Sequence, residues 1–467
     1  NIKYVNVIHL ALVALWATMS LVEGYRILCV FPVPSPSHNI LGKGIVDALL
    51  QAGHQVGTYT GPIVSQKVLS FSYLVSIAAS APEMQQAMLE DFDAVVTEWF
   101  VSDMPAGYAA VQQVPWILFS SLVPHPNLEM LVDDVTSTAL VPTMSTRAPI
   151  PMNFFQRVAN SLKIRWKTIS QYKDIFGPLA AARGSVLPPL SEVYNNVSIL
   201  LVNSHPVLAP AQSFPPNVVD IGGYHVDENG SLPKDLEELL NSSTQGFIYF
   251  SLGSVVEISE LPASLKTELS QMFGQLPYTV LWRSDEDLQD LPRNVHVRKW
   301  LPQPGILAHR NIKLFITHAG LLSVIEAVHH GVPVLAVPVF GDQPMNAERA
   351  AASGFAVKVD FHVGLASELR RGLDEMIGNE SYYKTAKHLS KLFHRRPVPP
   401  SKLIPHYVEL AIESQGAYHL RSAARHYPWY ARARIDQLLF CAALFYGLYR
   451  ACWIVVRQLR THKRKAE

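Results

Sequence analysis

The sequence predicts an α/β protein of two Rossmann-like, doubly wound domains that face a cleft, followed by one C-terminal transmembrane helix. Apolar runs alternate with amphipathic stretches in two successive series, which is the pattern of parallel sheets covered by helices. The 467 residues suit two domains. A composition of 49% hydrophobic and 16% charged residues is typical of large cores plus a membrane segment.

The first series begins with the apolar run RILCVF at 26–31, which predicts a strand. The next segment, 39–53, has apolar residues on helical spacing and a stop signal at Gly53. Three further apolar runs predict strands of the same sheet. They lie at 93–99, 116–121 and 198–204.

The second series begins at 247–254 and alternates strands with helices in the same way. Strands are expected at 278–284, 313–318 and 332–338, with helices at 261–276 and 323–331. The stretch 222–235, rich in Gly, Asp and Asn, predicts the boundary, which gives domains at 25–225 and 226–432. Ligands of such sheets bind at the carboxyl ends of strands, so we expect the site in the cleft.

Both ends of the chain carry targeting patterns. Residues 1–24, in which Lys3 precedes an apolar centre, predict a signal peptide. Residues 435–456 predict the transmembrane helix, and their apolar part holds a single charge, Arg450. The basic tail 457–467 follows directly. The positive-inside rule therefore predicts a cytosolic tail and a luminal body, as in a single-pass type I membrane protein.

Short motifs agree with a secretory location. Lys463 and Lys465 have the spacing of a dilysine-type retrieval signal for the endoplasmic reticulum, with a plain basic tail as the alternative. The net charge of +1 predicts no nucleic-acid partner. Four N-x-S/T triplets predict glycosylation sites. They are Asn196, Asn229, Asn241 and Asn379.

Polar side chains follow the strand at 313–318. His318 ends this strand, and Ser323 opens the next helix, whose N-terminal N–H groups attract anions. We expect both side chains to cradle a phosphate, with Gly320 allowing the backbone to approach closely. Glu326, one turn into the helix, can accept hydrogen bonds from the vicinal hydroxyls of a ribose.

Two further pairs of polar or aromatic residues complete the pattern. Asp342 and Gln343 follow another strand, and their hydrogen-bonding groups suit a polyhydroxyl ring. Upstream, Trp300 can stack on a flat base and Gln303 can hydrogen-bond nearby. Each residue alone is more often a cap, a turn or a core residue. Their occurrence together at successive strand ends predicts a nucleotide-sugar site.

The register of these residues resembles the signature box of the UDP-glycosyltransferases. The resemblance extends through FSLGS, VNSHP, FPPNVVDIGGYH, HLRSAARHYPWY and the C-terminal anchor, so it covers nearly the whole chain. The chain is most similar to the membrane-bound animal UDP-glucosyl/glucuronosyltransferases, and among these to invertebrate members. The family implies the two-domain GT-B fold and inversion of configuration at the transferred sugar.

The resemblance also implies a role for each residue of the box. An N-terminal domain at 25–225 binds the acceptor, and a C-terminal domain at 226–432 binds the UDP-sugar. Uracil would contact Trp300, the nucleoside Gln303 and the ribose Glu326. The hexose would contact both Asp342 and Gln343. The diphosphate would contact His318, Gly320, Ser323, Ser251 and Ser254.

The catalytic base is expected from the N-terminal domain. His38 lies at the start of the first helix, whose positive end disfavours imidazolium, so we expect a neutral His38 that can take a proton. In the family the matching histidine deprotonates the acceptor hydroxyl. A capping histidine is the alternative. A carboxylate normally orients this histidine; Glu98 stands where many members have Asp, and Asp103 is a nearby alternative.

Three departures from the family pattern stand out. Ala319 replaces a common Gly and brings a methyl group near the phosphates, and Leu322 replaces a common Asn. The segment 61–90 is markedly shorter than in family members, whose extra helices wall the acceptor pocket. A splice product, a faulty gene model and a degenerate paralogue all stay open as explanations.

These patterns predict an inverting transferase that moves a hexose from a UDP-sugar to a hydroxyl of a small lipophilic acceptor, for detoxification or metabolite conjugation. No cofactor or metal is expected. The resemblance to invertebrate members implies UDP-glucose as the donor. UDP-glucuronate is the alternative, but its extra carboxylate would want a basic residue near Asp342 and none occurs before Arg349. The alternatives are an impaired paralogue that binds UDP-sugar or regulates partner transferases, and another GT-B enzyme such as an epimerase. Homo- or hetero-oligomers with other transferases stay open.

Overall fold

The computed structural model describes most of the chain. The described residues are 24–33, 35–60, 71–100, 102, 104–132, 141–143, 151–162, 172–209, 212–227, 230–254, 256–362 and 364–466. The predicted signal peptide up to residue 23, the alternative carboxylate Asp103 and the triplet at Asn229 lie outside these residues.

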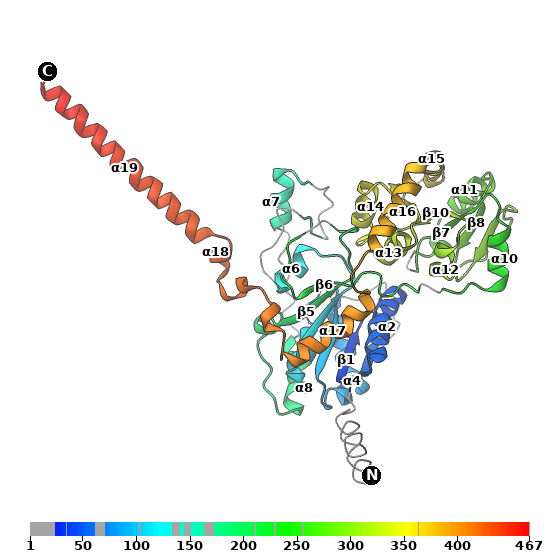
Figure 1. Cartoon of the computed structure of the whole chain (residues 1–467), viewed down its shortest axis with the longest axis horizontal. Coiled ribbons are helices and arrows are strands. Elements are labelled where there is room, and N and C mark those ends of the chain that lie inside the picture. Colours follow the sequence, from blue (N-terminus) through cyan, green and yellow to red (C-terminus); the bar gives the residue numbers. More distant parts are fainter. Residues whose placement is uncertain are drawn as a thin grey trace, which may run out of the picture.

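A six-stranded parallel sheet forms the N-terminal domain (Figure 1). Its spatial order is β2-β1-β3-β4-β5-β6. The inner strands are buried on both faces, which explains why they read as continuous apolar runs. The strands are β1 (Arg26–Phe31), β2 (Gln55–Thr60), β3 (Ala94–Trp99), β4 (Trp116–Ser120), β5 (Val197–Val202) and β6 (Val218–Asp220).

Helix α2 (Pro36–Gln51) follows β1 and begins three residues earlier than predicted. Pro36 occupies the first turn, where its missing N–H costs nothing and its fixed φ suits the helix. The helix ends as predicted before Gly53, whose φ is +93°. The other helices of this domain are α3 (Phe71–Ser80), α4 (Pro82–Ala87), α5 (Ala106–Gln112), α6 (Pro126–Val132), α7 (Phe154–Leu162), α8 (Tyr172–Ala182) and α9 (Leu190–Val193).

A second six-stranded parallel sheet forms the C-terminal domain, in the order β12-β11-β10-β7-β8-β9. Its strands are β7 (Phe247–Ser251), β8 (Thr279–Arg283), β9 (Val295–Arg298), β10 (Ile312–Thr317), β11 (Val334–Ala336) and β12 (Ala356–Lys358). Its helices are α10 (Lys234–Ser242), α11 (Ala263–Gly274), α12 (Gln303–Ala308), α13 (Leu321–His330), α14 (Gln343–Ala352), α15 (Leu365–Gly378) and α16 (Glu380–His394).

The chain returns to the N-terminal domain after α16. Helix α17 (Pro400–Glu413) packs against α2, and its Ile404, Val408 and Ala411 belong to the core on that side of the first sheet (Figure 1). The predicted C-terminal domain of 226–432 therefore differs from the fold, because its last part belongs to the N-terminal domain. An apolar stripe on α17 does not reveal which of two sheets it covers.

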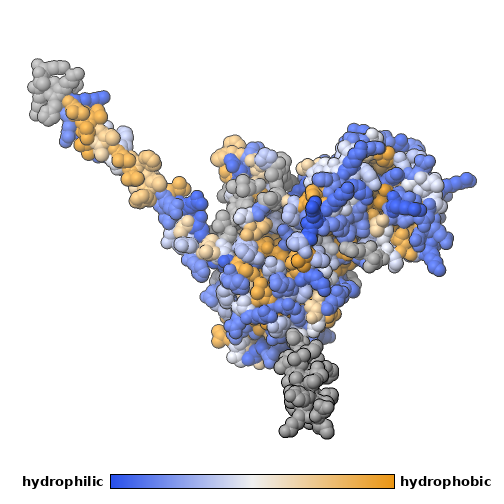
Figure 2. All heavy atoms as spheres, in the orientation of Figure 1, coloured by the Kyte–Doolittle hydropathy of each residue, from blue (hydrophilic) through white to orange (hydrophobic). Residues whose placement is uncertain are grey.

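The C-terminal segment projects from the body as a long helix (Figure 1). Short helix α18 (Trp429–Arg432) leads into α19 (Ile435–Ala466), whose residues Ile435–Arg460 are long and apolar enough to span a bilayer. Apolar side chains line much of α19 in Figure 2, and none of this stretch is buried against the body. The helix begins at the predicted residue and continues through the basic tail rather than ending at 456.

The two domains contact each other around the C-terminal edges of both sheets. Leu322 of α13 packs against the core of the N-terminal domain. In the opposite direction, Val123 and Leu208 join the core of the C-terminal domain. These contacts place the N-terminal ends of α2 and α13 near the same cleft. Leu322 is thus an apolar interdomain contact.

Candidate active site

The first element of the site is a histidine–carboxylate pair in the N-terminal domain. Nδ1 of His38, in the first turn of α2, is hydrogen-bonded to Oε1 of Glu98 near the end of β3. Strands β1 and β3 are neighbours in the sheet, so the two residues meet at one edge. The Glu98 side chain is fully buried and that of His38 keeps 13% exposure. Because Glu98 accepts at Nδ1, Nε2 is the nitrogen free to take a proton.

The pKa of His38 is raised, which corrects the expectation from its helix position. Burial favours the neutral ring, but the charge and hydrogen bond of Glu98, with Asp342 farther away, outweigh it. A neighbouring carboxylate thus dominates over the dipole of the helix N-terminus. The edge of the Phe100 ring packs against the imidazole at 4.8 Å between centroids, which restricts its orientation.

The second element is the predicted phosphate cradle at the start of α13. The His318 ring lies between two glycines, because a Cβ at Gly253 or at Gly320 would come within 2.5 Å of it. Gly253 belongs to the SLGS loop after β7, so two loops converge on the ring. Burial, and then the nearby charge of Arg283, lower the pKa of His318 to about 4. His318 is therefore a neutral hydrogen-bonding group at physiological pH.

Ala319 adopts a conformation that favours glycine. Its φ is +61°, in the left-handed region, and its side chain is buried. An L-residue costs about 1–2 kcal/mol in this region, so glycine would suit this position better than alanine. The carbonyl of Ala319 accepts a hydrogen bond from Nδ2 of Asn346 at 3.1 Å, which holds the turn. The methyl group thus strains the backbone of this turn.

Three of the predicted donor residues form one hydrogen-bonded group. Nε2 of Gln303, the first residue of α12, donates to Oγ of Ser323 at 3.1 Å and to Oε2 of Glu326 at 2.6 Å. Ser323 and Glu326 lie one turn apart on α13 and are buried. Burial raises the pKa of Glu326 to about 7, although the Gln303 hydrogen bond opposes this. Half-ionisation of Glu326 near neutral pH follows.

The remaining box residues occupy different surroundings. Trp300 is 67% exposed just before α12, so it is not a core residue and its ring is open to a ligand. Gln343 is buried, and its Oε1 accepts hydrogen bonds from the backbone of Val339 and Phe340 at 2.8 and 3.0 Å. Ser254 lies partly exposed in the SLGS loop.

Asp342 links the two halves of the site. It precedes α14, and Oδ2 accepts a hydrogen bond from Nδ2 of Asn346 at 2.6 Å. Burial raises the pKa of Asp342, while the Asn346 bond and the charge of His38 lower it. The influence is mutual, since Asp342 also raises the pKa of His38. The residue predicted to hold the sugar therefore lies across the cleft from the predicted base.

Three residues of the site carried no signal in the sequence. Arg283 ends β8 and donates to the carbonyl of Gly253, which fixes the SLGS loop. Asn346 connects Asp342 to the turn at Ala319. Phe100 flanks His38. All three act through tertiary contacts, which a motif at fixed spacing does not report.

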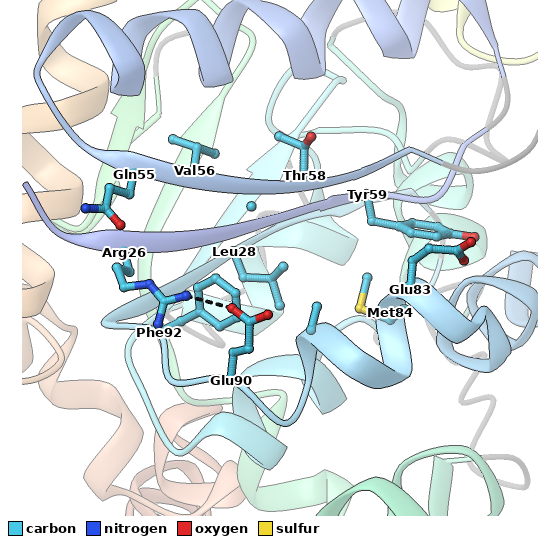
Figure 3. Close-up of a pocket in the computed structure, with 12 residues that line it drawn as sticks. Arg26, Leu28, Gln55, Val56, Thr58, Tyr59, Glu83, Met84, Glu90 and Phe92 are labelled. Atoms are coloured by element: carbon cyan, nitrogen blue, oxygen red, sulfur yellow. Dashed lines mark hydrogen bonds and ion pairs between the residues drawn. The ribbon is translucent and has the colours of Figure 1, made fainter.

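A recess of about 330 Å³ lies away from these residues, at the edge strand β2 (Figure 3). It lies between β1, β2 and α4, and the ion pair of Arg26 with Glu90 closes one end. None of the predicted site residues lines it. Helices α3 and α4 belong to segment 61–90, so this recess lies beside the segment that the sequence predicted to be shortened.

The predicted glycosylation sites that the structure describes are all at the surface. Asn196, Asn241 and Asn379 are exposed. The side chain of Asn196 accepts a hydrogen bond from Nη1 of Arg421 at 2.6 Å, and that of Asn379 caps α16 through the N–H of Ser381 at 3.0 Å. In both cases the oxygen is engaged, while the amide nitrogen is the atom that would carry a glycan.

Comparison with known proteins identifies the family and the fold. Residues 63–466 match the family model described as UDP-glucoronosyl and UDP-glucosyl transferase. UDP-glucosyltransferase 2 of Dactylopius coccus is 28% identical, covering 96% of this chain and 95% of that protein. UDP-glucuronosyltransferase 2B15 of Rattus norvegicus is 32% identical over 76% of this chain and 69% of that protein.

Solved structures show the same fold at low sequence identity. A UDP-glucosyltransferase from Polygonum tinctorium matches with a TM-score of 0.60 and 17% identity, covering 84% of this chain and all of that one. The spinosyn forosaminyltransferase SpnP matches with a TM-score of 0.59 and 17% identity, covering 83% of this chain and 99% of that one. The two facing parallel sheets are those of the GT-B glycosyltransferases, and the chain belongs to the UDP-glycosyltransferase family.

Proposed function

We propose that this glycosyltransferase moves glucose from UDP-glucose to a hydroxyl of a small lipophilic acceptor, with inversion at the anomeric carbon. The observation that carries this proposal is the position of His38. Its imidazole is paired with buried Glu98 on one side and is influenced by Asp342 of the other domain. This proximity supports a base at His38 and a sugar-binding carboxylate at Asp342 that act on the same substrate.

In the proposed reaction, Nε2 of His38 takes the proton of the acceptor hydroxyl. The oxygen forms a bond to the anomeric carbon while the bond from that carbon to the diphosphate oxygen breaks, and UDP leaves with the electron pair. The imidazolium that forms donates from Nδ1 to Glu98, which stabilises its charge. Attack from the face opposite UDP inverts the configuration. That this step needs no metal or other cofactor remains part of the proposal.

The donor would be held by the C-terminal domain. Trp300 offers an exposed ring for uracil, and Glu326 with Gln303 offers hydrogen-bonding groups for the ribose. The diphosphate would lie at the N-terminus of α13, between Ser254, neutral His318, Gly320 and Ser323, where free N–H groups favour an anion. Asp342 and Gln343 would hold the hexose.

A place in the endoplasmic reticulum membrane is also proposed. The exposed apolar helix α19 supports a membrane anchor, and the basic residues after it support a cytosolic tail and a luminal body. A role in detoxification or metabolite conjugation, and pairing with other transferases or with itself, belong to the same proposal.

One observation supports a second candidate function. The segment 61–90 is short, and an open recess lies beside it rather than a walled acceptor pocket. A protein that binds UDP-sugar without transferring it, or that regulates partner transferases, would fit this feature. The intact His38–Glu98 pair favours the active enzyme.

The test is a transfer assay on membranes that contain the full chain. Labelled UDP-glucose and UDP-glucuronate are each supplied with a panel of phenols and aliphatic alcohols, and UDP binding is measured in parallel. Transfer that depends on His38 supports the proposal. UDP binding without transfer to any acceptor would favour the second candidate.

A further inference from the structure

A second recess, of about 430 Å³, lies where the body meets the long C-terminal helix. Its walls come from the end of α6, from the turn before β5 and from the segment 418–432 that links α17 to α19. Figure 1 shows α19 leaving the body on the side of the N-terminal domain where α6 and β5 lie. Arg432 lines the recess, and α19 begins three positions later at Ile435. The recess therefore lies beside the start of the proposed membrane anchor.

The walls of this recess carry positive charge. Its basic lining residues are Arg421, Arg425, His426 and Arg432. No aspartate or glutamate of the described chain lines it, and the other lining residues are apolar or neutral polar. A recess lined by charge of one sign concentrates ions of the opposite sign. These walls therefore suit an anionic group.

The guanidinium of Arg421 is held in place by neutral oxygens. Its Nη1 donates to Oδ1 of Asn196 at 2.6 Å, and its Nη2 donates to Oγ of Ser198 at 3.1 Å. Its Nε donates to the carbonyl of Gly416 at 2.9 Å. Burial, and then the charge of Arg425, lower the pKa of Arg421 to about 10, so it stays charged at physiological pH. These contacts fix the guanidinium without neutralising it.

Arg425 brings a second guanidinium to the same recess. Its side chain has no hydrogen bond or ion pair to any residue that the structure describes. Burial lowers its pKa, and its charge in turn lowers the pKa of Arg421, so the two cations repel each other. Like charges placed close together without a counter-charge cost free energy. An anion bound between them would offset this cost.

Exposed tyrosines occur in the same segment of the chain. Tyr418 lines the recess and is 64% exposed, and Tyr427 and Tyr430 are exposed as well. Tyrosine is enriched at the membrane–water interface, where its ring lies at the level of the lipid headgroups. The apolar helix that follows begins at Ile435. Tyrosines and a basic recess directly before such a helix indicate that the recess lies at headgroup depth, where the available anion is a phospholipid phosphate.

We propose that this recess binds the phosphate of an anionic phospholipid from the leaflet that faces the body, with Arg421 and Arg425 as the main donors. The proposal goes beyond the transfer reaction and rests only on the proposed membrane anchor. Guanidinium groups offer paired N–H donors that match the oxygens of a phosphate. The acyl chains would lie in the bilayer alongside α19. A lipid bound in this way would fix the orientation of the body relative to the membrane, which a single helix does not do.

The experiment uses the full-length protein in detergent. The protein is first treated with a glycosidase, so that no glycan on the lining residue Asn196 covers the recess. The probes are dihexanoyl phosphatidate, dihexanoylglycerol, which has the same chains without the phosphate, and inorganic phosphate. Native mass spectrometry counts the lipid that stays on the protein, and calorimetry measures the affinities.

The variants separate the recess from its surroundings. Arg425→Gln removes the charge, and Arg425→Lys keeps the charge without the paired donors. Arg434→Gln is the matched control, because Arg434 lies one residue before α19, is exposed and does not line the recess. Since the Arg425 side chain makes no hydrogen bond within the described structure, all three variants should keep the wild-type melting temperature.

Loss of charge-assisted hydrogen bonds should weaken phosphatidate binding by about 10–100-fold in Arg425→Gln, by less in Arg425→Lys and not at all in Arg434→Gln. Dihexanoylglycerol should bind weakly and equally to all of these proteins. Equal losses in Arg425→Gln and Arg434→Gln would assign the lipid to general attraction by basic residues near the membrane and overturn the site. Inorganic phosphate that binds as tightly as phosphatidate would show a site for a free anion, and would overturn the lipid.

Separate measurements distinguish the recess from the other proposals. Release of the full chain from microsomes by alkaline carbonate would refute the membrane anchor, and with it the lipid as the source of the phosphate. Absence of UDP binding would refute the donor site and leave the recess unaffected. Arg425→Gln should leave both results unchanged. Equal phosphatidate binding by the wild type and Arg425→Gln would refute the recess alone.

Discussion

Nδ1 of His38 is hydrogen-bonded to Oε1 of Glu98, a buried carboxylate 60 positions later in the chain. Glu98 reaches the ring from the second-to-last position of β3. The contact fixes the tautomer and leaves Nε2 toward the cleft. Glutamate, whose side chain is one methylene longer than that of aspartate, is therefore compatible with a base at position 38.

Replacing His38 by Ala should reduce turnover by about 10²–10⁴-fold, the usual contribution of a general base. The affinity for UDP should stay unchanged, because the predicted nucleotide contacts belong to the other domain. Rates under saturating donor and acceptor, together with calorimetric UDP binding, check this. His419→Ala, at an exposed histidine, is the control. Full activity of the His38 variant would rule out the proposed base.

Replacing Glu98 by Gln should shift the acid limb of the pH–rate profile to lower pH. The carboxylate raises the pKa of His38 in the wild type, so the base becomes protonated as pH falls through that raised value. Without the charge the pKa falls, and the maximal rate falls too, because the imidazolium is less stabilised. The loss should be smaller than for His38→Ala, and greater in Glu98→Ala than in Glu98→Gln. An unshifted profile in Glu98→Gln, with Asp103→Ala impaired, would transfer the role to Asp103.

Replacing Trp300 by Ala should weaken UDP binding by about 1–3 kcal/mol, the range known for base–aromatic stacking. The ring is 67% exposed, so its removal should leave the melting temperature unchanged, which separates a lost contact from a damaged fold. Calorimetry measures the affinity, and Trp300→Phe should recover part of it. Equal UDP affinity in wild type and Trp300→Ala would exclude the stacking role.

Binding of UDP-glucose, whose phosphates do not titrate in this range, should strengthen as the pH rises from 6 to 8. The pKa of Glu326 is raised to about 7 by burial, so the carboxylate that accepts from the ribose hydroxyls is mostly protonated at the lower pH and ionised at the higher. Glu326→Gln should bind UDP-glucose more weakly and lose this dependence between pH 6 and 8. The measurement is the affinity for UDP-glucose as a function of pH. A pH dependence that persists in the variant would assign it to another group.

Protease added to sealed microsomes should remove at most the basic residues after 456 and leave the body intact. The membrane shields the luminal side, and the positive-inside rule places the tail in the cytosol. Glycan should be found on at least one of the predicted asparagines and disappear on glycosidase treatment. Digestion of the body without detergent would show the opposite orientation.

The sequence alone determined the fold class and the content of the donor box. Buried parallel strands must be apolar along their whole length, so runs such as 26–31 and 313–317 appear directly in the sequence. The residues from His318 to Glu326 lie on one strand end and one helix turn, and local geometry fixes their arrangement. The apolar segment beginning at 435 is readable because a spanning helix needs little beyond length and composition.

Only the tertiary structure decided what depends on contacts between distant segments. The helix that contains His38 was expected to keep its pKa low, but Glu98, on a strand 60 positions later in the chain, raises it. Helix α17 packs on the first sheet, although it follows the second domain in the chain. Asn346 joins Asp342 to the turn at Ala319, a contact that the linear order of these residues does not show. Burial and charge act through space, and a linear pattern records neither.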